Sequence, residues 1–553
     1  MSENLKIVIV GGVAGGASTA ARCRRLSETA EIHLFERNSY ISFANCGMPY
    51  YISGVISDRK EMNVQSIAGM EKRYRVNVRC GCEVTSIDRE NKTITYTEIE
   101  SGTQAHQQYD KLVLSPGAEI FRPPLPGGDN PRVMSLRNLE DMDRIKLAAE
   151  KYADKPAIVI GGGYIGLEMA ESLRERGMEV MLVELADQVF VAADREMAAP
   201  LHKELRKHGI DLRLRTSLTS VKENGDELEV TLNDGSKARC GMVIMAVGVR
   251  PEVKLAKEAG IEIGGLGGIA VNENMQTSDP DIYAVGDAVE VTNFVTKTKA
   301  LIPLAGPANR QGRIAADNIF GRKSTYKGTQ GTSVCKIFDQ TIAMTGANEK
   351  QLKKLGIPYE KIYVHPLNHA GYYPGATPVH LKLLFDSCDG RVLGAQAVGL
   401  KGIEKRIDVI AVAIRAGMTA EDLSELELSY APPYGSAKDP VNFAGFVANN
   451  VVIGDMDVCH TDEILELDEE RQILLDVRTP KEIEAGTLPG ATAIPVDQLR
   501  DRIDELDKGK DVLVSCRMGL RGYIATKILN QNGFKARNYT GGYLTYQQAT
   551  ADK

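Results

Sequence analysis

The chain lacks the features of a membrane-spanning or exported protein. None of its apolar runs approaches the roughly 18 to 20 residues that a membrane helix needs, and residues 1–10 lead into an apolar strand without the layout of a signal peptide. A net charge of −7 argues against nucleic acid or an anionic membrane surface as the main partner. We therefore expect a cytoplasmic protein that binds neither nucleic acid nor membrane.

The sequence is also poor in metal-binding and disulfide patterns. Its nine cysteines are scattered over 553 residues, with no CxxC pair and no cysteine–histidine cluster at zinc spacing. This excludes a disulfide scaffold and predicts no metal site, and most of the thiols are expected to pack as small apolar groups. Cys46 and Cys516 are the exceptions, because their neighbours could give a thiol the access and the lowered pKa that a nucleophile needs.

One pattern occurs twice in the first two-thirds of the chain. It consists of an apolar strand, a glycine turn, a helix start and a second strand that ends in an acidic residue, and it covers residues 7–36 and 157–184. This is the layout of a Rossmann dinucleotide site, so the repeat predicts two bound nucleotides. The second turn has the regular glycines, whereas Val13 stands in the first turn where the middle glycine is usual. A pyrophosphate can still bind there at the helix N-terminus.

The remaining third changes character at about Lys327. Strand-like alternation followed by a helix predicts a mixed α+β domain, and another α/β unit begins after a linker at residues 454–457. The chain is too long for a single core. We expect two nucleotide-binding domains, an α+β domain and a small C-terminal α/β domain, with the bounds 1–150 with 270–325, 151–269, 326–452 and 456–553.

These motifs resemble known families over nearly the whole chain. Residues 1 to about 450 resemble the flavoprotein pyridine nucleotide-disulfide reductases, and among them the single-cysteine coenzyme A-disulfide reductase branch. The motifs are Gly11–Gly16, Ser42–Gly47, Gly161–Glu168 and Tyr283–Asp287. Residues 455–553 resemble a rhodanese domain, through Asp476–Arg478, Gly486–Ala491 and Cys516–Arg521.

The combination resembles the coenzyme A-disulfide reductase–rhodanese fusions, which are also described as NADH-dependent persulfide or polysulfide reductases. The resemblance implies an α/β fold with two Rossmann-like FAD- and NAD(P)H-binding domains, an α+β dimerisation domain and a C-terminal α/β rhodanese domain. It also implies a homodimer, in which tyrosines of one subunit complete the site of the other.

The residue changes around Cys46 narrow the expected chemistry. The dithiol members of the family carry CxxxxC, but Tyr51 stands where the second cysteine would be. A lone cysteine cannot close an internal disulfide, so its oxidised form must be a mixed disulfide, a sulfenic acid or a persulfide. The peroxidase and oxidase relatives carry a histidine in the first glycine turn, where Val13 and Ala14 stand here. The resemblance thus implies reduction of coenzyme A persulfide, polysulfide or coenzyme A disulfide by NAD(P)H through Cys46.

The resemblance assigns further residues to catalysis and binding. Tyr372 and Tyr430 are expected to position or protonate the departing sulfur. The FAD residues are Gly11, Val13, Ala14, Gly16, Glu36, Arg37, Val84, Ser115, Gly117, Asp287 and Ala305. The NAD(P)H residues are Gly161, Gly163, Tyr164, Ile165, Gly166, Glu184 and Gly248. The coenzyme A residues are Ser18, Arg22, Arg25, Ser42, Asn45, Asn309 and Lys438.

The choice between NADH and NADPH stays open. Glu184 favours the free 2′-hydroxyl of NADH, but Arg195 leaves NADPH open, because an arginine could accept a 2′-phosphate.

In the C-terminal domain, the loop that begins at Cys516 is expected to wrap its backbone N–H groups around a sulfur anion, so that Cys516 carries sulfane sulfur. The loop residues after Cys516 are Arg517, Met518, Gly519, Leu520 and Arg521. The alternatives are an NADH oxidase or peroxidase that uses Cys46 sulfenic acid, and a rhodanese domain that serves only as a docking module.

Overall fold

The computed structural model describes residues 4–552, which fall into two compact units. The first unit runs to Leu185 and resumes over Gly209–Gly331, and the second comprises Ala186–His208 and the chain from Thr332 on. Within residues 4–552, no helix is both long and apolar enough to cross a bilayer.

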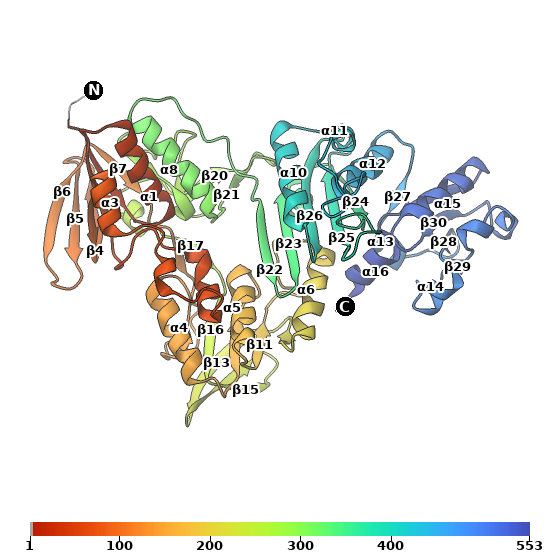
Figure 1. Cartoon of the computed structure of the whole chain (residues 1–553), viewed down its shortest axis with the longest axis horizontal. Coiled ribbons are helices and arrows are strands. Elements are labelled where there is room, and N and C mark those ends of the chain that lie inside the picture. The colour runs from red at the N-terminus through yellow and green to blue at the C-terminus, as the bar shows by residue number, and fades with distance from the viewer. Residues whose placement is uncertain (1–3, 553) are drawn as a thin grey trace. The chain divides into compact units, whose positions relative to one another are not determined.

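The first unit contains two five-stranded parallel sheets (Figure 1). One has the order β19-β7-β1-β2-β3, and the other has the order β12-β11-β10-β16-β9. The strands of the first are β1 (Lys6–Val10), β2 (Glu31–Glu36), β3 (Asn77–Cys80), β7 (Lys111–Leu114) and β19 (Ile282–Ala284). The strands of the second are β9 (Val133–Met134), β10 (Ala157–Ile160), β11 (Val180–Val183), β12 (Asp211–Arg213) and β16 (Met242–Met245).

Helices of this unit pack on the sheets, and two of them begin directly after the glycine turns. α1 (Ala14–Leu26) follows β1 and packs against α8 (Ala305–Ile319), and α5 (Tyr164–Glu175) follows β10. Continuous apolar strands such as β1, in which Ile7, Val8 and Ile9 are fully buried, are typical of parallel sheets covered on both faces. The other helices are η1 (Asn45–Gly47), α2 (Met48–Ser53), η2 (Arg59–Met62), α3 (Ile67–Tyr74), α4 (Leu139–Lys151), α7 (Lys254–Glu258) and η3 (Gly286–Ala288).

The smaller sheets of the first unit are antiparallel, except for one parallel pair between Ile269–Ala270 and Val289–Thr292. Two are three-stranded meanders, β4 (Cys82–Asp88), β5 (Thr93–Glu98) and β6 (Gln104–Gln108), and β13 (Leu218–Asn224), β14 (Glu227–Leu232) and β15 (Lys237–Cys240). β8 (Ala118–Ile120) pairs with β17 (Val249–Pro251), and β20 (Val289–Thr292) lies between β18 (Ile269–Ala270) and β21 (Lys299–Ala300).

The second unit contains an antiparallel sheet with the order β22-β23-β26-β25-β24. Its strands are β22 (Ser333–Ile337), β23 (Gln340–Gly346), β24 (Glu360–Val364), β25 (Val379–Phe385) and β26 (Val392–Gly399). The helices around it are α9 (Glu349–Leu355), α10 (Ile403–Ala416), α11 (Ala420–Glu425) and α12 (Pro440–Val452). Helix α6 (Arg195–Lys207) belongs to this unit, although it stands between β11 and β12 in the sequence.

A buried lysine attaches α6 to this sheet. The Lys382 ammonium group, which is fully buried on β25, binds the carboxylates of Asp194, Glu196 and Glu349 at 2.6–2.7 Å. Because Lys382 binds Asp194 and Glu196 together, it fixes the start of α6 onto the sheet.

The C-terminal part of the second unit is a parallel sheet with the order β27-β31-β30-β28-β29. Its strands are β27 (Val458–Cys459), β28 (Gln472–Asp476), β29 (Thr492–Ala493), β30 (Asp511–Ser515) and β31 (Lys535–Tyr539). The helices are α13 (Thr461–Leu465), α14 (Pro480–Glu484), η4 (Val496–Gln498), η5 (Ile503–Glu505), α15 (Leu520–Gln531) and α16 (Gly542–Thr550). Helix α16 packs against α6 (Figure 1).

Candidate active sites

The two glycine turns have matching geometry. A Cβ atom on Gly11 would lie 2.0 Å from the Ser115 carbonyl oxygen, and one on Gly161 would lie 2.4 Å from the Ala246 oxygen. Both residues have positive φ, so only glycine fits. Each turn therefore lets the chain pass close to the neighbouring strand and enter a helix, whose N-terminal N–H groups face the position of a pyrophosphate.

The acidic residue at the end of each second strand reaches its glycine turn. Glu36 Oε2 accepts a hydrogen bond from the Gly12 N–H at 2.9 Å, and Glu184 Oε2 accepts one from the Gly162 N–H at 2.6 Å. The predicted pairing of a glycine turn with an acid is thus present in both sheets. Each acid lies where the ribose of a bound dinucleotide is expected.

Apart from Val84 and Ala305, the predicted FAD residues lie at the carboxyl edge of one sheet. They follow β1, β2, β7 and β19, with Val84 on β4 and Ala305 at the start of α8. Ligands of doubly wound folds bind along this edge. The predicted NAD(P)H residues lie in the same way after β10, β11 and β16.

Asp287 fits a hydroxyl-rich ligand at this edge. Burial raises the pKa of its carboxyl, and the carboxyl makes no hydrogen bond to another residue within 4–552. Nearby, Gly117 leaves open space where a Cβ would stand. A half-buried carboxylate without a protein partner can accept a hydrogen bond from a ligand, and the ribityl hydroxyls of FAD would supply the donor. The residues present fit this cofactor.

Cys46 lies in η1 at the end of a strained segment. Cys46 is exposed as a residue, and Ser42, four residues earlier, has a positive φ of 45° that is held by hydrogen bonds to Gly12 and Val64. Backbone strain of this kind concentrates at functional sites. Partial desolvation, with the Glu168 and Asp287 carboxylates, raises the pKa of the Cys46 thiol. The lowered pKa expected from the sequence is therefore not supplied by the protein groups of this unit.

Glu168 is a feature that the sequence interpretation missed as a site residue. It lies on α5, and burial and the Glu171 carboxylate raise its pKa to about 7, while Tyr50 donates a hydrogen bond to it. Helix α2, which follows Cys46, packs on α5 through the Ser172 hydroxyl, which donates to the Pro49 carbonyl at 2.9 Å. A perturbed carboxyl beside a reactive thiol is typical of active sites. The burial of Glu168 marks it as a site residue, and the sequence does not show that burial.

The predicted coenzyme A residues lie in three places. Ser18 hydrogen-bonds Asn309 between α1 and α8, while Ser42 and Asn45 adjoin Cys46. Arg22 is held by Asp317 through its Nε at 2.8 Å and its terminal nitrogen at 2.6 Å, whereas Arg25 is exposed. Lys438 is exposed in the second unit. Asp317, far from Arg22 in the sequence, could not be recognised as its partner.

The two predicted tyrosines meet in the second unit. Their hydroxyl oxygens are 2.9 Å apart, and 76% of Tyr372 and 48% of Tyr430 are exposed. The hydrogen bond raises the pKa of Tyr372. The Ala370 N–H donates to the Gly435 carbonyl at 2.9 Å and brings the two loops together.

The predicted sulfur-carrying loop follows β30. The Gly519 N–H donates to Cys516 Sγ at 3.1 Å, and the sulfur lies at the bottom of the loop because Cys516 is buried. Arg517 is exposed, but Arg521 forms two hydrogen bonds with Glu482, at 2.6 and 2.8 Å. This pairing lowers the pKa of Glu482 to about 2. The cationic charge of Arg521 is therefore matched by a carboxylate, which the sequence alone did not reveal.

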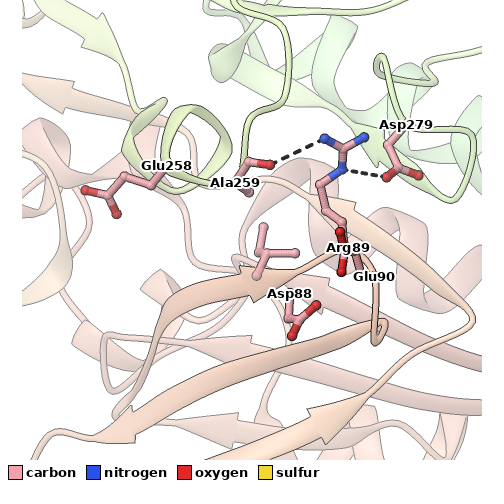
Figure 2. A pocket seen from close by; sticks show the side chains of 7 residues that line it. Asp88, Arg89, Glu90, Glu258, Ala259 and Asp279 are labelled. Carbon is pink, nitrogen blue, oxygen red and sulfur yellow. Dashed lines mark hydrogen bonds and ion pairs between the residues drawn. The ribbon is translucent and has the colours of Figure 1, made fainter.

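A cavity of about 690 Å³ in the first unit is separate from these residues. Figure 2 shows its lining, which includes Asp88, Glu90 and Glu258, with Arg89 bound to Asp279 and to the Ala259 carbonyl. It contains none of the predicted site residues. Its charged groups are paired or solvent-facing, so it supports no catalytic role.

Comparisons with known proteins bear on both units. Residues 5–312 match the family "Pyridine nucleotide-disulphide oxidoreductase", residues 332–439 match its dimerisation domain, and residues 461–549 match the rhodanese-like domain. A coenzyme A disulfide reductase from Staphylococcus haemolyticus is 35% identical over 447 residues, which are 81% of this chain and 100% of the relative.

Two solved structures are similar over almost the whole chain. The reduced CoADR-RHD of Bacillus anthracis is 50% identical with a TM-score of 0.96, and the match covers 98% of each chain. A NAD-dependent persulfide reductase from A. fulgidus is 35% identical with a TM-score of 0.90, covering 98% of this chain and 100% of the other. These matches confirm the α/β fold class and the family resemblance. The chain belongs to the pyridine nucleotide-disulphide oxidoreductase family and carries a C-terminal rhodanese-like domain.

Proposed function

We propose that this protein reduces coenzyme A persulfide, or a related polysulfide or disulfide, with NADH, through FAD and the single thiol of Cys46, and that Cys516 of the rhodanese domain carries sulfane sulfur. The observation that carries the proposal is the joining of one redox cysteine, beside two dinucleotide turns, to a rhodanese loop in the same chain. The printed names of the relatives, a coenzyme A disulfide reductase and a persulfide reductase, support it. The cytoplasm is the proposed compartment, since a reducing environment would keep the thiols free.

The chemistry at Cys46 is thiol–disulfide exchange. The Cys46 thiolate attacks the outer sulfur of coenzyme A persulfide, so that a bond forms between Cys46 Sγ and that sulfur and coenzyme A thiolate leaves. A flavin held by the predicted FAD residues would supply the two electrons of NADH, and the oxidised Cys46, once reduced, releases hydrosulfide. The sum is NADH plus persulfide to NAD⁺, thiol and hydrosulfide. With a disulfide, NADH and one proton give two thiols.

Two sets of side chains serve this exchange. Tyr372 and Tyr430 hold a hydroxyl pair at hydrogen-bond distance, which suits the delivery of a proton to a leaving thiolate. The matched dimerisation domain supports a homodimer, in which we propose that this pair completes the partner's site. Ser18, Arg25 and Asn309 offer donors and charge to a phosphate-rich ligand. Arg22 contributes only the donors that Asp317 leaves free.

The preference for NADH over NADPH has two supports. The Glu184 carboxylate stands at the end of β11, where it would repel a 2′-phosphate. Arg195, the candidate phosphate ligand, is paired with Asp187 and donates to the Ala551 carbonyl at 3.0 Å. An arginine engaged in this way offers less charge to a phosphate, and faster flavin reduction by NADPH than by NADH would overturn the preference.

The test is a pair of cysteine variants. Cys46→Ser should abolish NADH oxidation that depends on coenzyme A persulfide while retaining FAD, because the hydroxyl cannot form the sulfur–sulfur bond. Cys388→Ser is the matched control, since that cysteine is also exposed but lies outside the site. Persulfide-dependent turnover retained in Cys46→Ser would contradict the proposal.

A further inference from the structure

We propose that the dimerisation domain positions the sulfur-carrying thiol of the rhodanese domain. His365, which directly follows β24, and residues at the start of α6 and along it hold helix α16, and α16 holds the Cys516 loop. His365, Thr545 and Asp552 are positioning residues in this arrangement, because none of them touches the sulfur. The inference rests on the proposed function for the role of Cys516 in carrying sulfane sulfur.

The first turn of α16 binds the Cys516 loop directly. The Tyr543 N–H donates to the Cys516 carbonyl at 2.8 Å, and the Leu544 N–H donates to the Arg517 carbonyl at 3.1 Å. A Cβ on Gly542 would lie only 2.2 Å from the Cys516 carbonyl oxygen, so the approach requires glycine. Fixing these two carbonyls turns the opposite side of the loop, with the Gly519 N–H, toward the sulfur.

The dimerisation sheet holds the same turn from the other side. The Thr545 hydroxyl is 3.0 Å from His365 Nε2 in a buried position, and the Tyr363 N–H donates to the Thr540 hydroxyl at 2.9 Å. His365 Nδ1 is 2.8 Å from His380 Nδ1. Burial lowers the pKa of His365 to about 3 and that of His380 to about 4, so both rings are neutral near pH 7. The contact is therefore a neutral hydrogen bond whose strength does not change near neutral pH.

The far end of α16 is anchored on α6. Asp552 accepts hydrogen bonds from His202 Nδ1 and from Arg206, each at 2.7 Å, and Arg195 donates to the Ala551 carbonyl. The Val189 N–H donates to His202 Nε2 at 3.1 Å, which leaves the ring proton on Nδ1 to be given to Asp552. Because both ends of this helix are held, the loop that α16 contacts is held as well.

The arrangement makes a selective prediction. Loosening α16 should slow sulfur transfer through Cys516 without removing any loop residue and without changing the flavin site. In the transfer, the Cys516 thiolate takes the outer sulfur of thiosulfate and releases sulfite. Cyanide then removes that sulfur as thiocyanate, which regenerates the thiolate. This sulfur transfer is fastest when the loop already holds the Cys516 sulfur in the reactive position.

The test uses the full-length holoenzyme with Thr545→Val, which removes one hydroxyl and keeps the side-chain shape. Loss of one buried hydrogen bond predicts that kcat for thiosulfate–cyanide transfer falls about fivefold, with NADH-dependent flavin reduction unchanged. Thr545→Ser should retain the wild-type rate. Thr526→Val on α15 is the matched control, because the Thr526 hydroxyl is buried without a hydrogen-bond partner among the described residues.

Amide hydrogen exchange gives an independent readout. In Thr545→Val, and in a chain ending at Thr550, the amides of residues 516–519 and 543–544 should exchange faster than in the wild type and in Thr526→Val. Unchanged exchange and unchanged transfer in both variants would overturn the inference. So would an equal loss of transfer and of flavin reduction, because that would indicate general destabilisation.

The same data separate this inference from the proposed function. A wild-type protein without any transfer through Cys516 would contradict the sulfur-carrying role. The amide hydrogen-exchange rates of residues 516–519 would still decide whether α16 positions the Cys516 loop.

Discussion

Single residues around Cys46 set the electrostatics of the first site. Its thiol faces the Glu168 and Asp287 carboxylates and carries a raised pKa, so the protein groups of this unit favour the protonated thiol. This suits a cysteine that is protected until an oxidised sulfur compound or a bound cofactor changes its surroundings. It also makes Glu168 the residue through which the reactivity of Cys46 can be tuned.

Glu168→Gln should make Cys46 more reactive at neutral pH. Removing a neighbouring negative charge stabilises the thiolate, so the pKa of Cys46 should fall. The measurement is the pH dependence of Cys46 alkylation by iodoacetamide, with Glu90→Gln as an exposed control. A profile that does not move, or that moves to higher pH, would show that Glu168 does not act on the thiol.

Glu168 also predicts a pH dependence of stability. Its folded pKa, about 7, lies above the ordinary value of 4.5, so folding binds a proton between those two pH values. The stabilisation from this group is therefore full below about pH 4.5 and is lost as the pH rises through about 7. Chemical unfolding at several pH values should show a smaller loss of stability over this window in Glu168→Gln than in the wild type.

At the scale of elements, the sequence predicted the strands and glycine turns better than the ion pairs that join separate elements. The glycine turns and the acids Glu36 and Glu184 follow from a local pattern, because their spacing is set by one strand, one turn and one helix. The ion pairs Arg22–Asp317 and Arg521–Glu482 join residues from separate elements, so no local spacing reveals them. The grouping of residues 186–208 with the second unit has the same origin, since it depends on Lys382.

Lys382→Met should destabilise the second unit strongly. The substitution leaves the carboxylates of Asp194, Glu196 and Glu349 buried without their shared cation, and breaking one partner of a buried ionic cluster costs about 3–5 kcal/mol. Urea unfolding measures the loss. Lys354→Met on α9 is the control, because Lys354 is exposed, and it should change stability by less than about 0.5 kcal/mol. Equal stabilities for the two variants would contradict the assigned role of Lys382.

At the scale of the whole molecule, one chain joins domains of the pyridine nucleotide-disulphide oxidoreductase family to a rhodanese-like domain. The family resemblance, the α/β fold and the cofactor class could all be read from motifs. The support that α16 gives to the Cys516 loop could not, because it depends on contacts between β24, α6 and the last residues of the chain. The rhodanese domain is therefore packed against its neighbours rather than merely linked to them.

The central claim is that persulfide sulfur is the electron acceptor. The most direct measurement follows NADH and sulfide together, without oxygen, after coenzyme A persulfide is added to the holoenzyme. One hydrosulfide should be released for each NADH oxidised, with no release in Cys46→Ser. NADH oxidation that needs oxygen but no sulfur compound, and that yields no sulfide, would contradict it.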